Sequence, residues 1–163
     1  ITTLQPDKLL KKLNDRLCVN NDTLLFVTMF CGFLDVGSGK LLYSNGGHCA
    51  PILRAGGQAR DLPIPRGPLI GALSSARFSS MELTLLSDDA LYCYTDGVTE
   101  AQSPSGAEFS EERCKTLIDQ AGLQPLLEVL DAMRRRVAEF TATEVLEDDF
   151  TMLALRRKAS PDP

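Results

Sequence analysis

Three acidic residues at the ends of two apolar runs are the best candidates for chemistry in this sequence. Asp96 directly follows the run 90–95, and Asp148 and Asp149 directly precede the run 150–157. If these runs are neighbouring antiparallel strands, the end of one lies beside the start of the other. The carboxylates would then meet at one rim of a sheet, where they could bind a hard divalent cation such as Mg²⁺ or Mn²⁺. Gly97 would let the backbone turn away after Asp96.

Each of these signals also has a simpler interpretation. An Asp-Gly pair after a strand is more often a β-turn than a metal site, and the acidic stretch 147–149 resembles an ordinary solvated loop. His48, the single histidine, is a tempting general acid. We expect a structural role for it, because a lone histidine without a partner nucleophile or carboxylate is usually structural.

Length, charge and cysteine usage restrict the class of protein. The 163 residues fit one domain of ordinary size, and the net charge of −5 argues against a nucleic-acid or anionic-membrane partner. No apolar run approaches the roughly 20 residues needed to span a bilayer, and no signal peptide is visible. The five scattered cysteines form no CxxC pair, which indicates reduced, structural cysteines in the cytoplasm and makes a zinc site unexpected.

Apolar periodicity and turn residues predict the elements that would position these groups. Helices are expected at 6–17, 110–121 (with Ser110 as its cap) and 124–142. Strands are expected at 23–36, 41–45, 52–55, 81–86, 90–95 and 150–157. The run 23–36 reads as one long strand, buried over most of its length, with a bulge or close packing at Gly32. Residues 23–62 read as an antiparallel meander, and a strand returning after two helices indicates an α+β fold.

Four segments, taken in order, resemble the metal-dependent protein serine/threonine phosphatases of the PPM type, in the bacterial SpoIIE/RsbU branch. The segments are LNDRL, FVTMFCGFLDVGSGKLLYSNGGHCAPIL, YTDGVTEAQSPSGAEFSEER and EDDFTML. Their order and spacing extend the resemblance over about residues 4–157. It implies a PPM phosphatase-like antiparallel β-sandwich flanked by helices. We expect a single domain over residues 1–157 and a disordered tail at 158–163.

The resemblance also implies a metal-dependent mechanism. In the complete family site, two Mn²⁺ or Mg²⁺ ions activate a water that attacks the phosphorus of phosphoserine or phosphothreonine, without a covalent enzyme intermediate. Asp96 matches the metal-binding aspartate of the family's Asp-Gly motif, and Gly97 is its backbone companion. Asp148 matches the aspartate that opens the Asp-Asp-x-Thr motif, and Asp149 ranks second. No catalytic side chain beyond this metal-water chemistry is expected.

The resemblance also covers two other residues of interest, Glu100 and His48. Glu100 matches a family position but is assigned no catalytic role. His48 falls in the family's Asn-x-Gly-His segment, which packs between strands.

The sequence also departs from the family pattern. The family's Gly-Asp strand motif and its Asp-Val-x-Gly-His-Gly motif do not occur here, and residues 34–40 (LDVGSGK) read as a hairpin turn. One interpretation is an N-terminally incomplete phosphatase domain, which Ile1 as first residue favours. Another is a degenerate, non-catalytic phosphatase-like module that sequesters a regulator. A third is an unrelated acidic α+β protein. We expect this chain alone to have little or no phosphatase activity.

Partners follow from the same resemblance. It implies a cytoplasmic signalling regulator in sigma-factor regulation or stress response. The substrate would be a phosphorylated, anti-anti-sigma-factor-like protein, and a sensor or receiver domain would lie upstream. An incomplete sheet would expose strand edges and apolar surface, so a homodimer or a partner chain is expected. No nucleic-acid or membrane partner is expected.

Overall fold

The computed structural model describes residues 5–142 and 149–158, and the chain divides into two compact units. The first unit comprises residues 1–48 and 63–85, and the second comprises residues 49–62 and 86–163. Most of the predicted tail, residues 159–163, lies outside the described residues.

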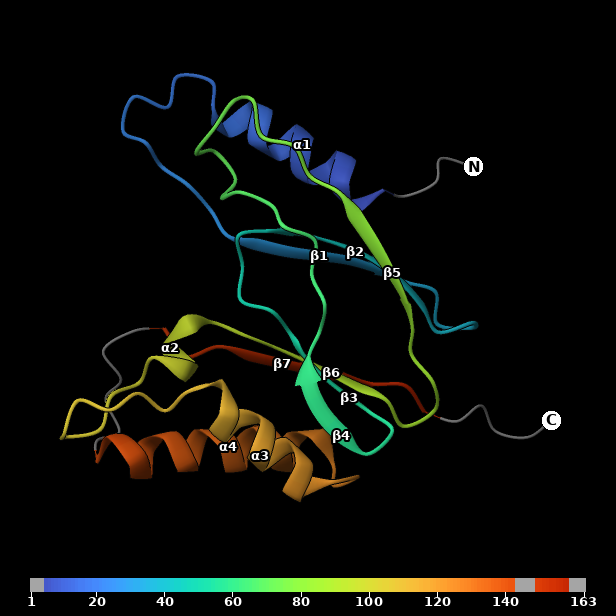
Figure 1. The fold of residues 1–163 in the computed structure, drawn as a ribbon, viewed down its shortest axis with the longest axis vertical. Helices are drawn as coiled ribbons and strands as arrows, with labels where there is room; N and C mark the ends of the chain where they lie inside the picture. Colours follow the sequence, from blue (N-terminus) through green and yellow to red (C-terminus); the bar gives the residue numbers. More distant parts are fainter. Residues whose placement is uncertain (1–4, 143–148, 159–163) are drawn as a thin grey trace. The chain divides into compact units, whose positions relative to one another are not determined.

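The first unit consists of one helix and a three-stranded antiparallel sheet (Figure 1). Helix α1 (Pro6–Leu17) has the predicted bounds and starts with the proline that suits a first helical position. The strands are β1 (Met29–Leu34), β2 (Lys40–Gly46) and β5 (Ser80–Thr84), in the order β1-β2-β5. The turn predicted at 37–40 joins β1 to β2, which confirms the hairpin.

The prediction of one long buried strand over 23–36 is wrong. Strand β1 covers only Met29–Leu34, and the apolar side chains at 24–27 are exposed. Asn21 explains the difference, because its side chain accepts a hydrogen bond from Leu25 N–H (2.8 Å) and donates one to the Leu25 carbonyl (2.7 Å). Leu24 lies between them in a left-handed conformation at φ 54°. These bonds hold the segment in a turn, and this turn is incompatible with a continuous strand over 23–36.

Gly32 shows the close packing that its place in β1 predicts. A Cβ added there would lie 3.0 Å from Leu41 Cδ1 on the neighbouring strand. The expected meander over 23–62 is nevertheless wrong, since β2 pairs with β1 and β5 but not with the next strand in sequence. The chain leaves this sheet at Gly46 and Gly47, and Gly47 has φ 73°, a conformation that favours glycine.

The second unit combines a four-stranded antiparallel sheet with helices. Its strands are β3 (Ile52–Ala55), β4 (Gln58–Asp61), β6 (Ala90–Tyr94) and β7 (Met152–Arg156), in the order β4-β3-β6-β7. Its helices are α2 (Asp96–Thr99), α3 (Glu111–Ala121) and α4 (Leu126–Thr141). Helices α3 and α4 lie side by side, with α3 packed on β4 and α4 on β7 (Figure 1).

Local signals placed these two long helices well. Gly122 follows α3 at φ 58°, and its N–H bonds to the carbonyls of Ile118 and Asp119, so it ends the helix as predicted. Ser110 occupies the position before α3, but its side chain makes no capping hydrogen bond. Arg156 on β7 adds a tertiary contact by donating to the carbonyls of Leu123 (3.0 Å) and Gln124 (2.9 Å). It thereby fixes the α3–α4 connection against the sheet.

Apolar side chains from the sheet and the helices form the core of the second unit. Strand β6 is buried along nearly all its length, as its composition predicts. The buried cluster comprises Ile52, Ala90, Tyr92, Tyr94, Val98, Phe109, Cys114, Ile118, Val129, Met133 and Val137. Antiparallel sheets with flanking helices confirm the α+β class. Within the described ranges, no helix has the length and apolar character needed to cross a bilayer.

Candidate functional site

The site begins with the pairing of β6 and β7. The two strands are antiparallel neighbours, and Tyr94 lies opposite Met152. The residues that follow β6 therefore lie beside the residues that precede β7. This confirms the strand geometry on which the predicted convergence of Asp96 and Asp149 depends.

Thr95 fixes this strand end through three hydrogen bonds. Its hydroxyl donates to the Asp149 carbonyl (2.6 Å) and accepts from Thr151 N–H (3.0 Å), and its own N–H donates to the Thr151 carbonyl (3.1 Å). The backbone of Asp149 is thus held next to the residue that precedes Asp96. Sequence reasoning did not single out Thr95. A signal was present, because a hydroxyl at the end of an apolar strand and directly before an aspartate is suited to such a bridge.

Asp96 begins a one-turn helix instead of a β-turn. Its carbonyl accepts hydrogen bonds from Glu100 N–H (2.9 Å) and from the Thr99 hydroxyl (3.2 Å), and these bonds close α2. Its carboxylate is exposed and accepts a hydrogen bond from Gly97 N–H (3.1 Å). Gly97 itself is buried inside α2. The Asp96 carboxylate is therefore presented to solvent from a rigid strand-to-helix junction.

Acidic side chains surround the base of this junction. Burial raises the pKa of the Cys49 thiol, and the negative charges of Asp96, Glu111 and Glu100 raise it further. Burial, with Glu111 as the next cause, also raises the pKa of Tyr94, whose hydroxyl donates to Glu111 Oε1 at 3.3 Å. Glu111 was not singled out from the sequence. This end of the second unit carries a negative field, which attracts cations.

The described residues supply only part of a metal site. Asp148 lies outside the described residues, which leaves Asp96 and Asp149 of the three predicted ligands. Over residues 5–142 and 149–158, no group of three or more His, Cys, Asp and Glu side chains is arranged to hold a metal ion. A Mg²⁺ ion is six-coordinate and Mn²⁺ likewise takes several oxygen ligands. The carboxylates described here do not complete such a set.

His48 belongs to the first unit, and its contacts fit the expected structural role. Its Nδ1 lies 3.0 Å from the Thr28 hydroxyl, and its carbonyl accepts a hydrogen bond from the Asn45 side chain at 3.0 Å. The LDVGSGK segment forms the predicted turn. Asp35 accepts hydrogen bonds there from Ser38 N–H (2.8 Å) and from the Ser38 hydroxyl (2.9 Å). The bond from the Ser38 backbone is the main cause that lowers the pKa of the Asp35 carboxyl.

Known proteins resemble the chain over nearly its whole length. The family model for Stage II sporulation protein E (SpoIIE) matches residues 2–158. Protein IcfG of Synechocystis sp. is 31% identical over 145 residues, which are 88% of this chain and 23% of that protein. Phosphoserine phosphatase RsbU of Bacillus subtilis is 25% identical over 162 residues, which are 96% of this chain and 47% of that protein. The chain therefore spans less than half the length of either relative.

Solved structures share the fold. The structure of the RsbU and RsbW domains of Rv1364c from Mycobacterium tuberculosis has a TM-score of 0.73 and 26% identity, and the match covers 91% of this chain and 41% of that chain. The phosphatase domain of the cell-fate determinant SpoIIE from Bacillus subtilis, presoaked with Mn, has a TM-score of 0.71. It is 16% identical, and the match covers 99% of this chain and 71% of that chain.

Proposed function

Because the chain belongs to the SpoIIE family, we propose that it is part of a phosphatase domain that hydrolyses phosphoserine or phosphothreonine on a partner protein. The observation that carries the proposal is the junction where the chain leaves β6 for Asp96, beside the segment with Asp149 that leads into β7. Since the family model spans both compact units, we propose that they are parts of one domain, over residues 1–157.

We assign three carboxylates as metal ligands, namely Asp96, Asp148 and Asp149. A bound Mn²⁺ or Mg²⁺ pair would activate water and neutralise charge on phosphoryl oxygens. Thr95 orients the Asp149 backbone through its hydroxyl, and the one-turn helix α2 holds the Asp96 carboxylate in solvent. The carboxylates around Cys49 add negative charge that favours cation binding. Gly97 contributes its backbone only, by donating its N–H to Asp96.

We further propose that this chain by itself has little turnover. Three carboxylates leave most coordination positions of two divalent ions to water, and binding with so few protein ligands is weak. The small number of metal ligands also favours a second candidate function, a phosphatase-like module that binds a regulator without catalysis. Metal affinity separates the two candidates, because the binding module needs no metal.

The partner and the setting are also proposals. Similarity to RsbU of Bacillus subtilis and to the RsbU and RsbW domains of Rv1364c supports a phosphorylated, anti-anti-sigma-factor-like partner in sigma-factor regulation or stress response. We place the protein in the cytoplasm, with a sensor or receiver domain upstream in the complete protein. A homodimer fits the exposed apolar side chains at residues 24–27 of the first unit.

The test is hydrolysis of a phosphoserine peptide by the complete protein with Mn²⁺, before and after single substitutions. We expect D96N and D148N each to lower kcat/KM at least about 100-fold, since each removes a charged ligand from the ions that activate water. D131N is the matched control, because Asp131 is exposed on α4 and makes no described contact with the junction. Unchanged activity in both variants would remove the site assignment.

Two further measurements separate the candidates. Isothermal titration with Mn²⁺ is expected to show binding by the complete protein and weaker binding by this chain alone. If the complete protein neither binds Mn²⁺ nor hydrolyses the peptide, but still binds a regulator, the non-catalytic module is correct.

A further inference from the structure

A groove of 480 Å³ lies along α3 and α4 of the second unit. Apolar side chains line part of it, from Phe109 ahead of α3, Leu117 on α3 and Phe140 on α4. Two arginines, Arg113 and Arg136, add basic groups to the lining. Small-molecule sites are commonly 300–1,000 Å³ in volume and combine an apolar lining with a few polar groups, so the groove has the size and composition of such a site.

Aromatic packing holds one of these arginines in position. The Arg113 guanidinium carbon lies 4.8 Å from the centroid of the Phe140 ring, which is cation–π geometry. Phe109 meets Phe140 edge-on, with ring centroids 5.4 Å apart and planes at 77°. The ring is thereby fixed from a second side. A guanidinium stacked on a fixed ring keeps its edge N–H groups available to a ligand.

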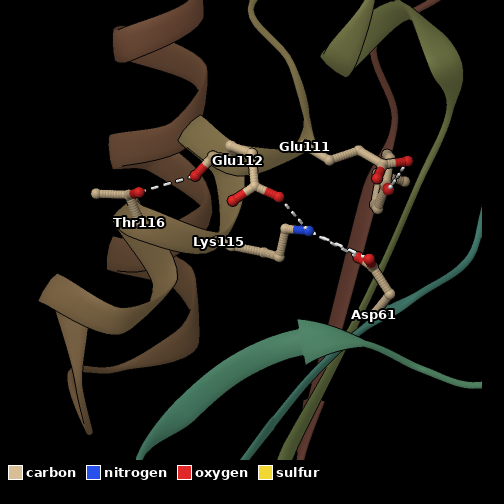
Figure 2. A network of polar contacts seen from close by, with 6 residues as sticks. Asp61, Glu111, Glu112, Lys115 and Thr116 are labelled. Carbon is tan, nitrogen blue, oxygen red and sulfur yellow. Dashed lines mark hydrogen bonds and ion pairs between the residues drawn. The ribbon is translucent and has the colours of Figure 1, made fainter.

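The acidic groups that line the groove have other partners. Lys115 binds Glu112 at 2.7 Å and also contacts Asp61 on β4 at 3.2 Å (Figure 2). Glu139 pairs with Arg136 at 3.4 Å. Among the described residues, Arg113 forms no ion pair and no side-chain hydrogen bond. The groove therefore contains a positioned guanidinium that is not paired with any carboxylate of the described residues.

We propose that this groove binds a small carboxylate with an apolar body. The carboxylate would accept two N–H bonds from the Arg113 guanidinium, whose planar fork matches that group. The apolar body would lie against Phe109, Leu117 and Phe140, and its surface would thereby be removed from water. Arg113 supplies the cation for this contact, since the described residues form no ion pair with it. The site lies on α3 and α4 and is separate in sequence from the Asp96 junction.

The probe for the test is N-acetylphenylalanine, titrated into the ¹⁵N-labelled chain and followed by amide chemical shifts. Its matched neutral probe is N-acetylphenylalaninamide, which keeps the apolar body and removes the charge. We expect shifts confined to α3, α4 and residue 109, with millimolar affinity for the acid. Affinity for the amide should be at least about 5-fold weaker, because the charge-assisted bonds are lost.

Substitutions of arginine test whether the Arg113 guanidinium binds the carboxylate of the probe. R113Q should weaken binding of the acid at least about 5-fold, and R113K should give a smaller loss because it keeps the charge but loses the planar fork. R135Q is the control, since Arg135 is exposed on α4, next to the groove residue Arg136 in sequence, and does not itself line the groove. Equal affinity for acid and amide, shifts outside α3 and α4, or unchanged binding by R113Q would each overturn the proposal. The two-probe comparison on the unmodified chain decides the question even if a variant fails to fold.

Discussion

The two compact units place their apolar side chains differently. In the second unit, residues from β3, β6, α2, α3 and α4 form one buried cluster. In the first unit, four consecutive apolar residues, 24–27, are exposed by between 44% and 77%. The second unit thus buries apolar side chains of its sheet and of its helices in one cluster. The first unit leaves a continuous apolar segment in solvent.

In the first unit, hydrogen bonds from a buried polar side chain attach a loop to the helix. Asn14 is fully buried on α1, where its side chain donates to the Leu73 carbonyl (2.9 Å) and accepts from Gly71 N–H (2.9 Å). Cys18 also donates to the Gly71 carbonyl, at 3.4 Å. These bonds attach the 71–73 loop to α1. We therefore expect apolar truncation to be most harmful in the second unit, and loss of a hydrogen bond to be most harmful in the first.

The largest effect is expected for I118A in the second unit. Ile118 is fully buried between α3 and the sheet, and removing its side chain leaves a cavity that costs about 2–5 kcal/mol. Urea denaturation followed by circular dichroism measures the loss, a suitable method because the chain has no tryptophan. L127A is the control, since Leu127 is 71% exposed on α4 and should change stability by less than about 0.5 kcal/mol. Similar losses in both variants would contradict a core at this place.

A smaller but clear effect is expected for N14A in the first unit. The substitution leaves Gly71 N–H and the Leu73 carbonyl without their partner, and a buried unsatisfied polar group costs about 1–3 kcal/mol. The same denaturation experiment measures it. D15A, one position further along α1, removes only an exposed pair with Lys11 and should cost less than about 1 kcal/mol. If N14A were as mild as D15A, the loop attachment proposed for Asn14 would be wrong.

The smallest effect on stability is expected for F26S in the same unit. Phe26 is 57% exposed, so its replacement should change the free energy of unfolding by about 0.5 kcal/mol or less. Its effect should instead appear in sedimentation velocity, as a smaller associated fraction, because an exposed apolar patch promotes self-association. F109S gives the contrast, since Phe109 is buried in the second unit and its loss costs several kcal/mol. A loss above about 1 kcal/mol for F26S would show that Phe26 is covered in solution.

Prediction from the sequence succeeded where the signal is local. The apolar spacing and Pro6 gave α1 its bounds, and Gly122 marked the end of α3. It failed at 23–36, where apolar and β-branched content favoured a strand. The two bonds from Asn21 to Leu25 hold that segment in a turn instead. Asparagine is common in both turns and loops, so the sequence did not predict that the Asn21 side chain would bind the backbone of Leu25.

In the candidate site, too, local features were predictable from the sequence and contacts between distant segments were not. The sequence by itself placed Asp96 after a buried strand and Asp149 before another, because strand ends are visible as changes in hydrophobicity. Only the tertiary structure decided that β6 and β7 are neighbours, that Thr95 bridges them, and that Asp96 opens a helix. It alone brought Arg113 of α3 over Phe140 of α4. These outcomes depend on packing between segments distant in the chain, which local spacing does not encode.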